Sequence, residues 1–475
     1  MIFLAKLIKR LRKLSREGAP TRPTSARAIR RLQDAAIHEY AKSVRFIYIS
    51  LSAVALLGCS DFRSQFEKVD PPEVPVIDSP RRARPVCYTK QSDNEIDFLE
   101  ERSLDKSAHD YVTPTEKVSV SEWPPIDDDL DFENLDLAID RQLQHFAKHP
   151  PTGTIQLGED VYPLNWAIKS LEQIKKMVDG TRHCIASGNR DQCLAAYGQE
   201  LKAKYAMYQP KLGPSDPRYG QKETALFTGY YTPLIHTTTA QSGKFSHPVY
   251  GLPSTNRDRT VGRVQIDFEN RLAGKGLELY YGADIFELYI AHIQGSAHVV
   301  IDGDKSAGHF LNYAGTNAQH FQFISHYMVE KGYIKNDSIA AQREFLEAHP
   351  SMQKEIYQNC PSYVYFKATR SPPTGSIGVP VTENRSIATD SKYYGFKGLV
   401  SFISTTRPEE NQNSNQSCDQ VKFRPFSRFY LNQDTGGAIR GKARADLFFG
   451  EGDYAELAAS NEVEKGNIYF LMLKR

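Results

Sequence analysis

The chain has 475 residues, of which 40% are hydrophobic and 24% are charged, which is the composition of an ordinary globular protein. A chain of this length predicts two to four domains. The formal net charge of +2 hides an asymmetry, because residues 1–45 carry 12 Lys or Arg and only 3 acidic residues. Residues 59–475 carry 47 basic and 54 acidic residues, a net charge of −7, which argues against a nucleic-acid partner.

An export signal is the first feature along the chain. Residues 46–57 form an uncharged apolar run of 12 residues behind Lys42 and Arg45. The run is too short to span a bilayer as a helix but suits a signal peptide. It ends in Leu-Leu-Gly-Cys at residues 56–59, which resembles the lipobox of bacterial lipoproteins and predicts lipidation of Cys59. The alternative is a buried helix with an unrelated Cys.

Residues 1–45 form a basic extension in front of this signal. Either the extension is real and its first 16 residues suit an anionic membrane surface, or translation begins at Val44, which we favour. Ser60 after the Cys favours a lipid anchor on the periplasmic face of the outer membrane. Export also permits disulfides, for which Cys184 and Cys193 are the natural local pair. The other Cys residues show no metal-binding spacing; they are Cys87, Cys360 and Cys418.

The remaining elements are expected in the following order. Residues 60–125 are rich in Pro and charge and predict a flexible tether. Helical periodicity follows at residues 135–149 and 164–178, and Gly180 is expected to end the second helix. From about residue 222 the pattern is mostly β, and it is interrupted by helical stretches and one polar surface loop. The helical stretches are 318–331 and 339–348, and the loop is 411–417.

Two motifs in the first half of the β region point to ligand binding. FTGYYTP at residues 227–233 places Tyr230 and Tyr231 on opposite faces of a strand, so that one of them can contact a ligand. HIQGSAHV at residues 292–299 contains Gln294, whose amide suits sugar hydroxyl and acetamido groups. That motif and NYAGTN at residues 312–317 could equally be turns.

Two further motifs carry carboxyl groups. GVPVTENRSIATD at residues 378–390 ends in Asp390, and residues 433–452 contain Asp434 and Asp446. Asp446 precedes Leu447 and two Phe residues, and desolvation beside apolar groups raises the pKa of a carboxyl group, as a general acid requires. The alternative is a surface strand residue. The spacing of 12 between Asp434 and Asp446 fits a strand, a turn and a second strand.

In this order the four motifs resemble the membrane-bound lytic murein transglycosylase A family over residues 223–474, including its three-Asp domain. The resemblance implies a mainly β fold with α, in which a double-psi β-barrel and a smaller inserted β domain border a groove for the glycan. The barrel with its N-terminal helices would comprise residues 126–235 and 371–475, and the insert residues 236–370.

The resemblance also implies the reaction. The chain would cleave the β-1,4 bond between N-acetylmuramic acid and N-acetylglucosamine in peptidoglycan and release 1,6-anhydro products, without a metal or other cofactor. Asp446 would be the single catalytic residue, with Asp434 and Asp390 in supporting roles. The implied substrate-binding residues are Thr228, Gly229, Tyr230, Gln294, Gly295, Ser296, Gly436 and Gly437.

The chain departs from the family pattern at three insert positions, where Ala297, Ala318 and Ile285 replace Gly, Gly and Pro. These departures motivate one alternative, a non-catalytic peptidoglycan-binding lipoprotein of the same fold. The triplet from Asp434 to Gly436 also matches aspartic proteases, but that chemistry needs two such Asp residues, and the chain has no second triplet.

Overall fold

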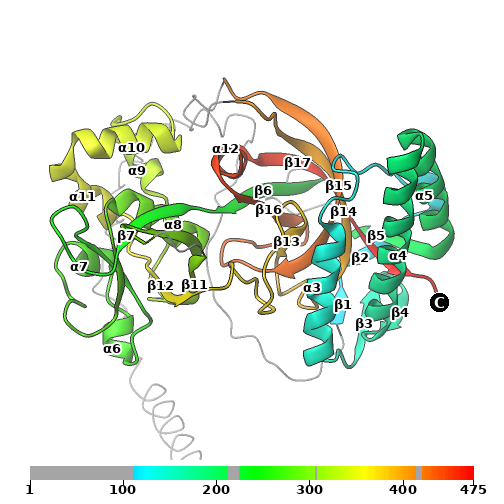
Figure 1. The fold of residues 1–475 in the computed structure, drawn as a ribbon, viewed down its shortest axis with the longest axis horizontal. Coiled ribbons are helices and arrows are strands. Elements are labelled where there is room, and N and C mark those ends of the chain that lie inside the picture. Colours follow the sequence, from blue (N-terminus) through cyan, green and yellow to red (C-terminus); the bar gives the residue numbers. More distant parts are fainter. Residues whose placement is uncertain (1–110, 212–223, 305–307, 413–419) are drawn as a thin grey trace, which may run out of the picture. The chain divides into compact units, whose positions relative to one another are not determined.

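The computed structural model describes residues 111–211, 224–304, 308–412 and 420–475 (Figure 1). The expected signal peptide, with Cys59, lies outside these residues, as do Cys87, Cys418 and most of the loop at 411–417. The described part has a mixed α/β fold with three sheets. Within the described residues, no helix is long and apolar enough to cross a membrane.

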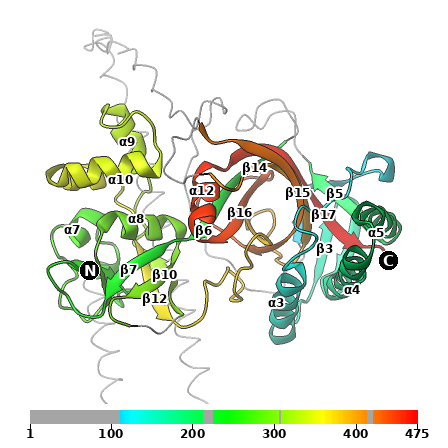
Figure 2. The same cartoon turned by 45° about the horizontal axis from the view of Figure 1, so that its top comes forward.

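Six strands of the largest sheet close into a barrel, whose curvature is visible in Figure 2. The strand order is β14-β15-β13-β16-β6-β17, and β17 pairs again with β14, which closes the ring. These strands are rich in β-branched and aromatic residues, which favour extended conformations. Their bounds are β6 Ala225–Thr232, β13 Ser386–Thr389, β14 Val400–Pro408, β15 Phe423–Asp434, β16 Arg444–Glu451 and β17 Val463–Leu473.

Two strands and one helix extend this barrel. β5 (Tyr205–Pro210) pairs with β17, and β2 (Thr115–Lys117) pairs with β5. α12 (Asp453–Asn461) contacts β6 and β16. The helix approaches closely at Gly229, where a Cβ would lie 2.8 Å from the Cα of Ala459 in α12 and 2.6 Å from the ring of Phe449 in β16. Close packing therefore favours glycine at this position of β6.

A second sheet of six strands lies between β6 and β13 in the sequence and has its own hydrophobic core. Pro233, which has no N–H group to donate, separates β6 from the first strand of this sheet. The strand order is β12-β11-β10-β7-β9-β8. The strands are β7 Leu234–Thr238, β8 His247–Tyr250, β9 Glu278–Gly282, β10 Ser296–Ile301, β11 His309–Thr316 and β12 Val364–Thr369.

The helices of this region connect its strands. α8 begins after Asp284, whose side chain accepts a hydrogen bond of 2.8 Å from Phe286 N, and ends at Gly295 in the left-handed conformation. This ending turns the chain directly into β10. The helices are α6 Asn256–Arg259, α7 Arg263–Asp267, α8 Ile285–Gln294, α9 Ile324–Glu330, α10 Ile339–Ala348, η3 Pro350–Met352 and α11 Gln353–Gln358.

The N-terminal described residues form helices beside a small sheet. The order in the sheet is β1-β3-β4. The disulfide Cys184–Cys193 joins the end of α4 to α5, which confirms the expected pair, and Cys360 is a buried free thiol. The elements are β1 Tyr111–Thr113, η2 Val120–Glu122, α3 Leu135–Lys148, β3 Thr154–Leu157, β4 Asp160–Pro163, α4 Trp166–Ser187 and α5 Arg190–Lys204.

Three local expectations were wrong. Gly180 does not end the second helix, because α4 continues to Ser187; Met177, Val178 and Thr181 are buried, and their packing outweighs a glycine cost of about 1 kcal/mol. Residues 111–122 form β1, β2 and η2 rather than a tether, since β2 completes the sheet beside β5. The helix expected at 318–331 begins only at Ile324, in α9.

The three departures from the family pattern occupy structural positions. Ala297 is fully buried in the core of the second sheet, and Ile285 is the first residue of α8, where proline is also favoured. Ala318 has a φ of +56°, in the left-handed region that favours glycine.

Ala318→Gly should therefore stabilise the protein by about 1 kcal/mol, because glycine adopts this conformation without steric strain. Urea unfolding of the variant and the wild type would measure the difference. Ala240→Gly is a suitable control, since Ala240 is exposed and is not among the residues with positive φ. Equal or lower stability of Ala318→Gly would show that the left-handed turn is not strained.

A buried ion pair joins the N-terminal segment to the barrel. Arg385, directly before β13, donates two hydrogen bonds to Asp128, at 2.7 Å and 2.9 Å, and both side chains are 0% exposed. Asp128 also accepts hydrogen bonds from the backbone N–H groups of Leu130, Phe132 and Phe429. One carboxylate therefore connects the start of the first helical segment to two barrel strands.

Candidate active site

Asp446 lies within a row of side chains that crosses four barrel strands. The register pairs Asp446 of β16 with Thr228 of β6 on one side and with Ala388 of β13 on the other. Ala388 in turn pairs with Asp434 at the end of β15. Since paired residues in neighbouring strands project from the same face, the two carboxyl groups share one face and are separated by a strand with a small side chain. We call these four residues the carboxyl row.

The carboxyl group of Asp446 is half-buried and held from one side. The hydroxyl group of Thr228 donates a hydrogen bond of 2.5 Å to its Oδ1. Burial raises the pKa of Asp446, although the positive charge of Arg444 and the hydrogen bond from Thr228 act in the opposite direction. Because Thr228 occupies Oδ1, Oδ2 is the oxygen that is available to carry the proton.

The raised pKa of Asp446 confirms the expectation from the sequence, but the apolar neighbours differ from those expected. Leu447 projects from the opposite face of β16 into the main core, where it is fully buried. Phe448 shares the face of Asp446 and packs against Tyr230, with ring centroids 5.0 Å apart. These two rings, rather than Leu447, border the carboxyl row.

The carboxyl group of Asp434 accepts three hydrogen bonds. Its Oδ1 receives the backbone N–H groups of Thr435 and Ser376, each at 2.8 Å, and its Oδ2 receives the Tyr230 hydroxyl at 3.2 Å. Burial raises the pKa of Asp434 to about 6, and these hydrogen bonds together with Lys397 limit the rise.

Asp390 and the two glycines Gly436 and Gly437 complete the carboxyl motifs. Asp390 is buried, and its carboxylate accepts the backbone N–H groups of Lys392 and Gly441, at 2.9 Å and 2.7 Å. It therefore connects the end of β13 to the loop that precedes β16. Gly436 is half-buried and Gly437 is exposed in the same loop, and no hydrogen bond among the described residues joins either to Asp446.

The Gln294 motif reaches the carboxyl row indirectly. Oε1 of Gln294, the last residue of α8, accepts the backbone N–H of Tyr231 at 3.1 Å, one residue beyond Tyr230. Tyr231 itself is buried, so the two adjacent tyrosines do face opposite sides. Ser296 starts β10 and pairs with Asn312, away from Asp446 in the register. His298 of β10 lies 3.1 Å from Glu451 of β16 and forms a second link between the two sheets.

Two ionisable residues near the row were missed from the sequence. Lys397 is 8% exposed. In the sequence it is a lone charge between Gly395-Phe396 and Gly398-Leu399, which was the available signal of its burial. Glu462 is fully buried at the end of α12, directly before Val463, which pairs with Thr228. Neither carboxyl oxygen of Glu462 has a hydrogen-bond partner among the described residues.

Glu462→Gln should raise the free energy of unfolding at neutral pH. Burial raises the pKa of Glu462 well above its usual value, so the stability contributed by its protonated form is lost as pH rises through the folded-state pKa. Gln cannot ionise, and the advantage of the variant should therefore grow from acidic to alkaline pH. Urea unfolding across this pH range would measure it, with exposed Glu172→Gln as the control. A difference that does not depend on pH would contradict the expectation.

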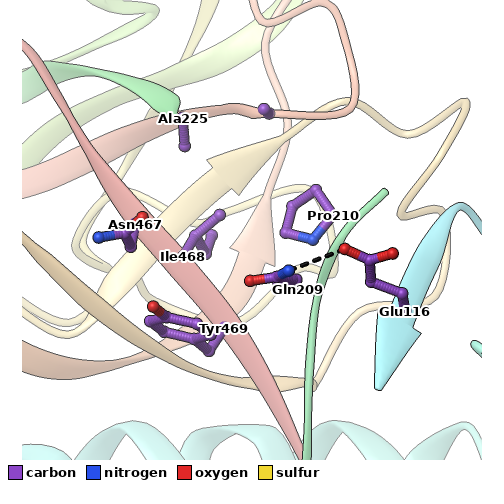
Figure 3. A pocket seen from close by; sticks show the side chains of 8 residues that line it. Glu116, Gln209, Pro210, Ala225, Asn467, Ile468 and Tyr469 are labelled. Atoms are coloured by element: carbon purple, nitrogen blue, oxygen red, sulfur yellow. Dashed lines mark hydrogen bonds between the residues drawn. The ribbon is translucent and has the colours of Figure 1, made fainter. Parts of the chain in front are cut away.

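A separate pocket is lined by residues of β2, β5, β6 and β17, together with Ala443 (Figure 3). In it the side chain of Gln209 donates a hydrogen bond of 2.8 Å to Glu116. Its described lining contains none of the residues proposed for catalysis or substrate binding. The lining residues are Glu116, Gln209, Pro210, Ala225, Ala443, Asn467, Ile468 and Tyr469. Within the described part of the chain, no cluster of metal-ligating side chains is present.

Comparison with protein families assigns both parts of this architecture. Residues 226–367 match the MltA specific insert domain, and residues 385–472 match the 3D domain. The chain belongs to the MltA family of lytic transglycosylases. The insert match begins in β6 and ends in β12, and the 3D match contains all three Asp residues of the carboxyl motifs.

Curated relatives of this MltA-type chain share its sequence over about half its length. Membrane-bound lytic murein transglycosylase A of Vibrio cholerae serotype O1 is 29% identical over 277 residues, which cover 57% of this chain and 71% of the relative. The protein of the same name from Escherichia coli K12 is 28% identical over 249 residues, which cover 52% and 65%. The matched region thus spans about two thirds of the curated relatives.

Solved structures agree in fold. The crystal structure of Escherichia coli MltA with bound chitohexaose has a TM-score of 0.57 at 21% identity, and the match covers 79% of this chain and 98% of that chain. A membrane-bound lytic murein transglycosylase from Agrobacterium tumefaciens has a TM-score of 0.56 at 22% identity, with coverage of 76% and 97%. The chain has an MltA-like fold, a mixed α/β structure with a six-strand barrel and additional sheets.

Proposed function

We propose that this chain is a lytic transglycosylase that cleaves the β-1,4 bond between N-acetylmuramic acid and N-acetylglucosamine of peptidoglycan. The observation that carries the proposal is the half-buried carboxyl group of Asp446, which has a raised pKa and one oxygen held by Thr228. The family membership and the bound chitohexaose of the Escherichia coli relative support a glycan substrate.

Asp446 would act first as an acid and then as a base. Oδ2 donates its proton to the glycosidic oxygen as the bond to the N-acetylmuramic acid carbon breaks, and N-acetylglucosamine leaves with a hydroxyl group. The 6-hydroxyl group of the same muramic acid then attacks that carbon and returns its proton to Asp446. Since this attack is intramolecular, proximity replaces the second carboxyl group of ordinary glycosidases. The reaction requires neither a metal nor a cofactor.

The finer architecture belongs to the same proposal. We infer that the barrel is of the double-psi type, with residues 126–235 and 371–475, and that residues 236–370 form the inserted domain. The glycan would lie between them, along the carboxyl row and near Gln294. The hydrogen bond from Tyr231 to Gln294 and the pair His298–Glu451 support this placement, because they join the inserted region to β6 and β16, the strands that carry Thr228 and Asp446.

The supporting roles follow from the contacts. Thr228 and Tyr230 would line the site, and Asp434 would face the sugar from across the row. Gly229 and Gly295 would shape the backbone around it, and Asp390 would hold the loop that carries Gly436 and Gly437. Ser296 would contact the glycan from the inserted domain. The three departures from the family pattern lie in structural positions, so they no longer favour a non-catalytic binding protein.

We also propose that Cys59 carries the lipid anchor and that the protein acts at the periplasmic face of the outer membrane. The membrane-bound relatives support an anchor, and the lipobox-like residues 56–59 supply the Cys. Several acyl chains together bind a membrane stably, whereas one binds it only marginally.

The test is the chemistry of the products. Purified protein in detergent would be incubated with peptidoglycan, and the released fragments would be identified by mass spectrometry. Fragments ending in 1,6-anhydro-N-acetylmuramic acid support the proposal. Fragments with a free reducing end would indicate a hydrolase, and binding without any product would indicate a binding protein.

A further inference from the structure

The chain returns from the second sheet to the barrel through a small closed loop between β12 and β13. We call residues 373–381 the return loop. A backbone hydrogen bond of 3.0 Å from Gly375 N to Val379 O joins its two sides, and a bond of 2.9 Å from Gly378 N to Gly375 O closes a β-turn at its tip. These bonds give the loop a defined shape, so that it can hold a neighbouring side chain in place.

The return loop packs directly against the end of β15. A Cβ at Gly375 would lie 2.7 Å from a backbone carbonyl oxygen of β15 and 3.4 Å from Cβ of Asp434. The next residue, Ser376, donates its backbone N–H to Oδ1 of Asp434 at 2.8 Å. Because Thr435 N also binds Oδ1, Oδ2 is the oxygen that is turned toward the Tyr230 hydroxyl group. The loop therefore helps to set the orientation of the Asp434 carboxyl group.

The second sheet holds the return loop from its other side. Asn312 of β11 is 4% exposed, and its Oδ1 accepts the backbone N–H of Thr374 at 3.1 Å. Thr374 lies only two residues before Ser376. Asn312 also pairs in register with Ser296 of β10, one of the proposed glycan contacts, and paired residues project from the same face. A glycan held at Ser296 would thus lie beside the residue that fixes the loop.

The orientation of Asp434 matters for the reaction proposed above. Cleavage of a glycosidic bond passes through a transition state in which positive charge develops on the sugar ring. The carboxyl group of Asp434 shares a face with that of Asp446, and its interaction with the ring depends on where its oxygens point. Misplacement of such a group by about 1 Å can lower a rate about 100-fold.

We propose that the return loop is a positioning element of the transglycosylase reaction, in which Asn312 fixes the loop and the Ser376 N–H fixes Asp434. This inference rests on the proposed function. It gives Asn312, the first residue of the NYAGTN motif, a role in the site. Asn312 and Ser376 act through Asp434 without touching the substrate, and the proton transfers stay with Asp446.

Ser376→Pro tests the hydrogen bond directly, because proline has no N–H group. Ser376 is exposed and is the second residue of the turn, a position that proline favours, so the loop should keep its shape. Ser376→Ala, which retains the N–H group, is the matched reference. With the full chain and soluble glycan strands of peptidoglycan, kcat of Ser376→Pro should lie about 10-fold below that of Ser376→Ala. KM and the midpoint of urea unfolding should be similar in the two variants.

Asn312 is tested by a second pair of variants. Asn312→Leu removes the acceptor for the Thr374 N–H and should lower kcat about 10-fold. Asn312→Asp keeps an oxygen at that place, and Lys367, the register partner of Asn312 in β12, can compensate the added charge, so most of kcat should be restored. Asp434→Ala should lower kcat at least as much as Ser376→Pro does. Adding Ser376→Pro or Asn312→Leu to it should cause no further loss, because groups that act through one residue are not additive.

Equal kcat values for Ser376→Pro and Ser376→Ala would overturn the proposal. So would a wild-type kcat in Asp434→Ala, or losses that multiply in the double variants. If Ser376→Pro does not fold, the comparison of Asn312→Leu with Asn312→Asp decides, and equal losses in these two would contradict the role of Asn312. If the wild-type protein releases no anhydro product, the proposed function fails instead, which is a distinguishable result.

Discussion

Replacement of Asp446 by Asn should reduce the rate of anhydro-product formation by about 10²- to 10⁴-fold, because the amide can neither donate nor recover the proton. Asn has nearly the same shape and can still accept the hydrogen bond from Thr228, so the fold and the binding of glycan should persist. The measurement is the initial rate of release of 1,6-anhydro fragments from peptidoglycan, together with sedimentation of the protein with the insoluble wall.

Asp453→Asn makes the same chemical change at an exposed position of α12 and should retain the wild-type rate. Asp446→Asn that binds the wall but releases no product would agree with a role in catalysis alone. An Asp446→Asn protein that still releases anhydro fragments at the wild-type rate would remove Asp446 from the mechanism.

Asp128→Asn should destabilise the barrel by about 3–5 kcal/mol, because it removes one partner of a buried ion pair and leaves the Arg385 guanidinium without a counter-charge. The new amide group would also point N–H donors at groups that are themselves donors. Urea unfolding followed by tryptophan fluorescence is suited to the measurement. Both Trp residues of the chain, Trp123 and Trp166, lie in the N-terminal described part.

The neighbouring Asp127→Asn is the matched control. Asp127 pairs with Arg190 at 2.8 Å, but both side chains are substantially exposed, so the loss should stay within about 1 kcal/mol. Burial would raise the pKa of Asp128, but the charge and hydrogen bonds of Arg385 outweigh it and lower the pKa. Stability from the ionised form is therefore present above the unfolded-state pKa and is lost as pH falls. The stability of Asp128→Asn should therefore not show this decrease at acidic pH. If Asp128→Asn and Asp127→Asn lowered the free energy of unfolding equally, the importance of burial would be contradicted.

Local patterns predicted much of the structure. Amphipathic spacing predicted α3 and α10 closely, and the spacing between Asp434 and Asp446 predicted the two strands β15 and β16. Periodicity reports which face of an element is buried, and that information is contained in a short segment of the chain. It failed at Gly180, where burial of the helix outweighs a weak local preference.

The neighbours of the carboxyl groups could not be predicted in the same way. The strands that carry Asp434 and Asp446, β15 and β16, do not pair as a hairpin, because β13 lies between them. Burial of Lys397 and Glu462 also depends on elements far away in the sequence, and a lone charge in an apolar stretch is more often exposed. Their effect on the site is therefore visible only after the barrel closes.

The amino-acid sequence by itself identified the family, since its motifs match the MltA insert domain and the 3D domain, and it singled out Asp446 as the candidate acid and base. The tertiary structure alone decided which groups control that carboxyl group. Thr228 lies 218 positions away in the chain, and only strand pairing places its hydroxyl group 2.5 Å from Asp446. Residue types and short spacings are local properties, whereas proton affinity depends on burial and on charges that distant segments bring together.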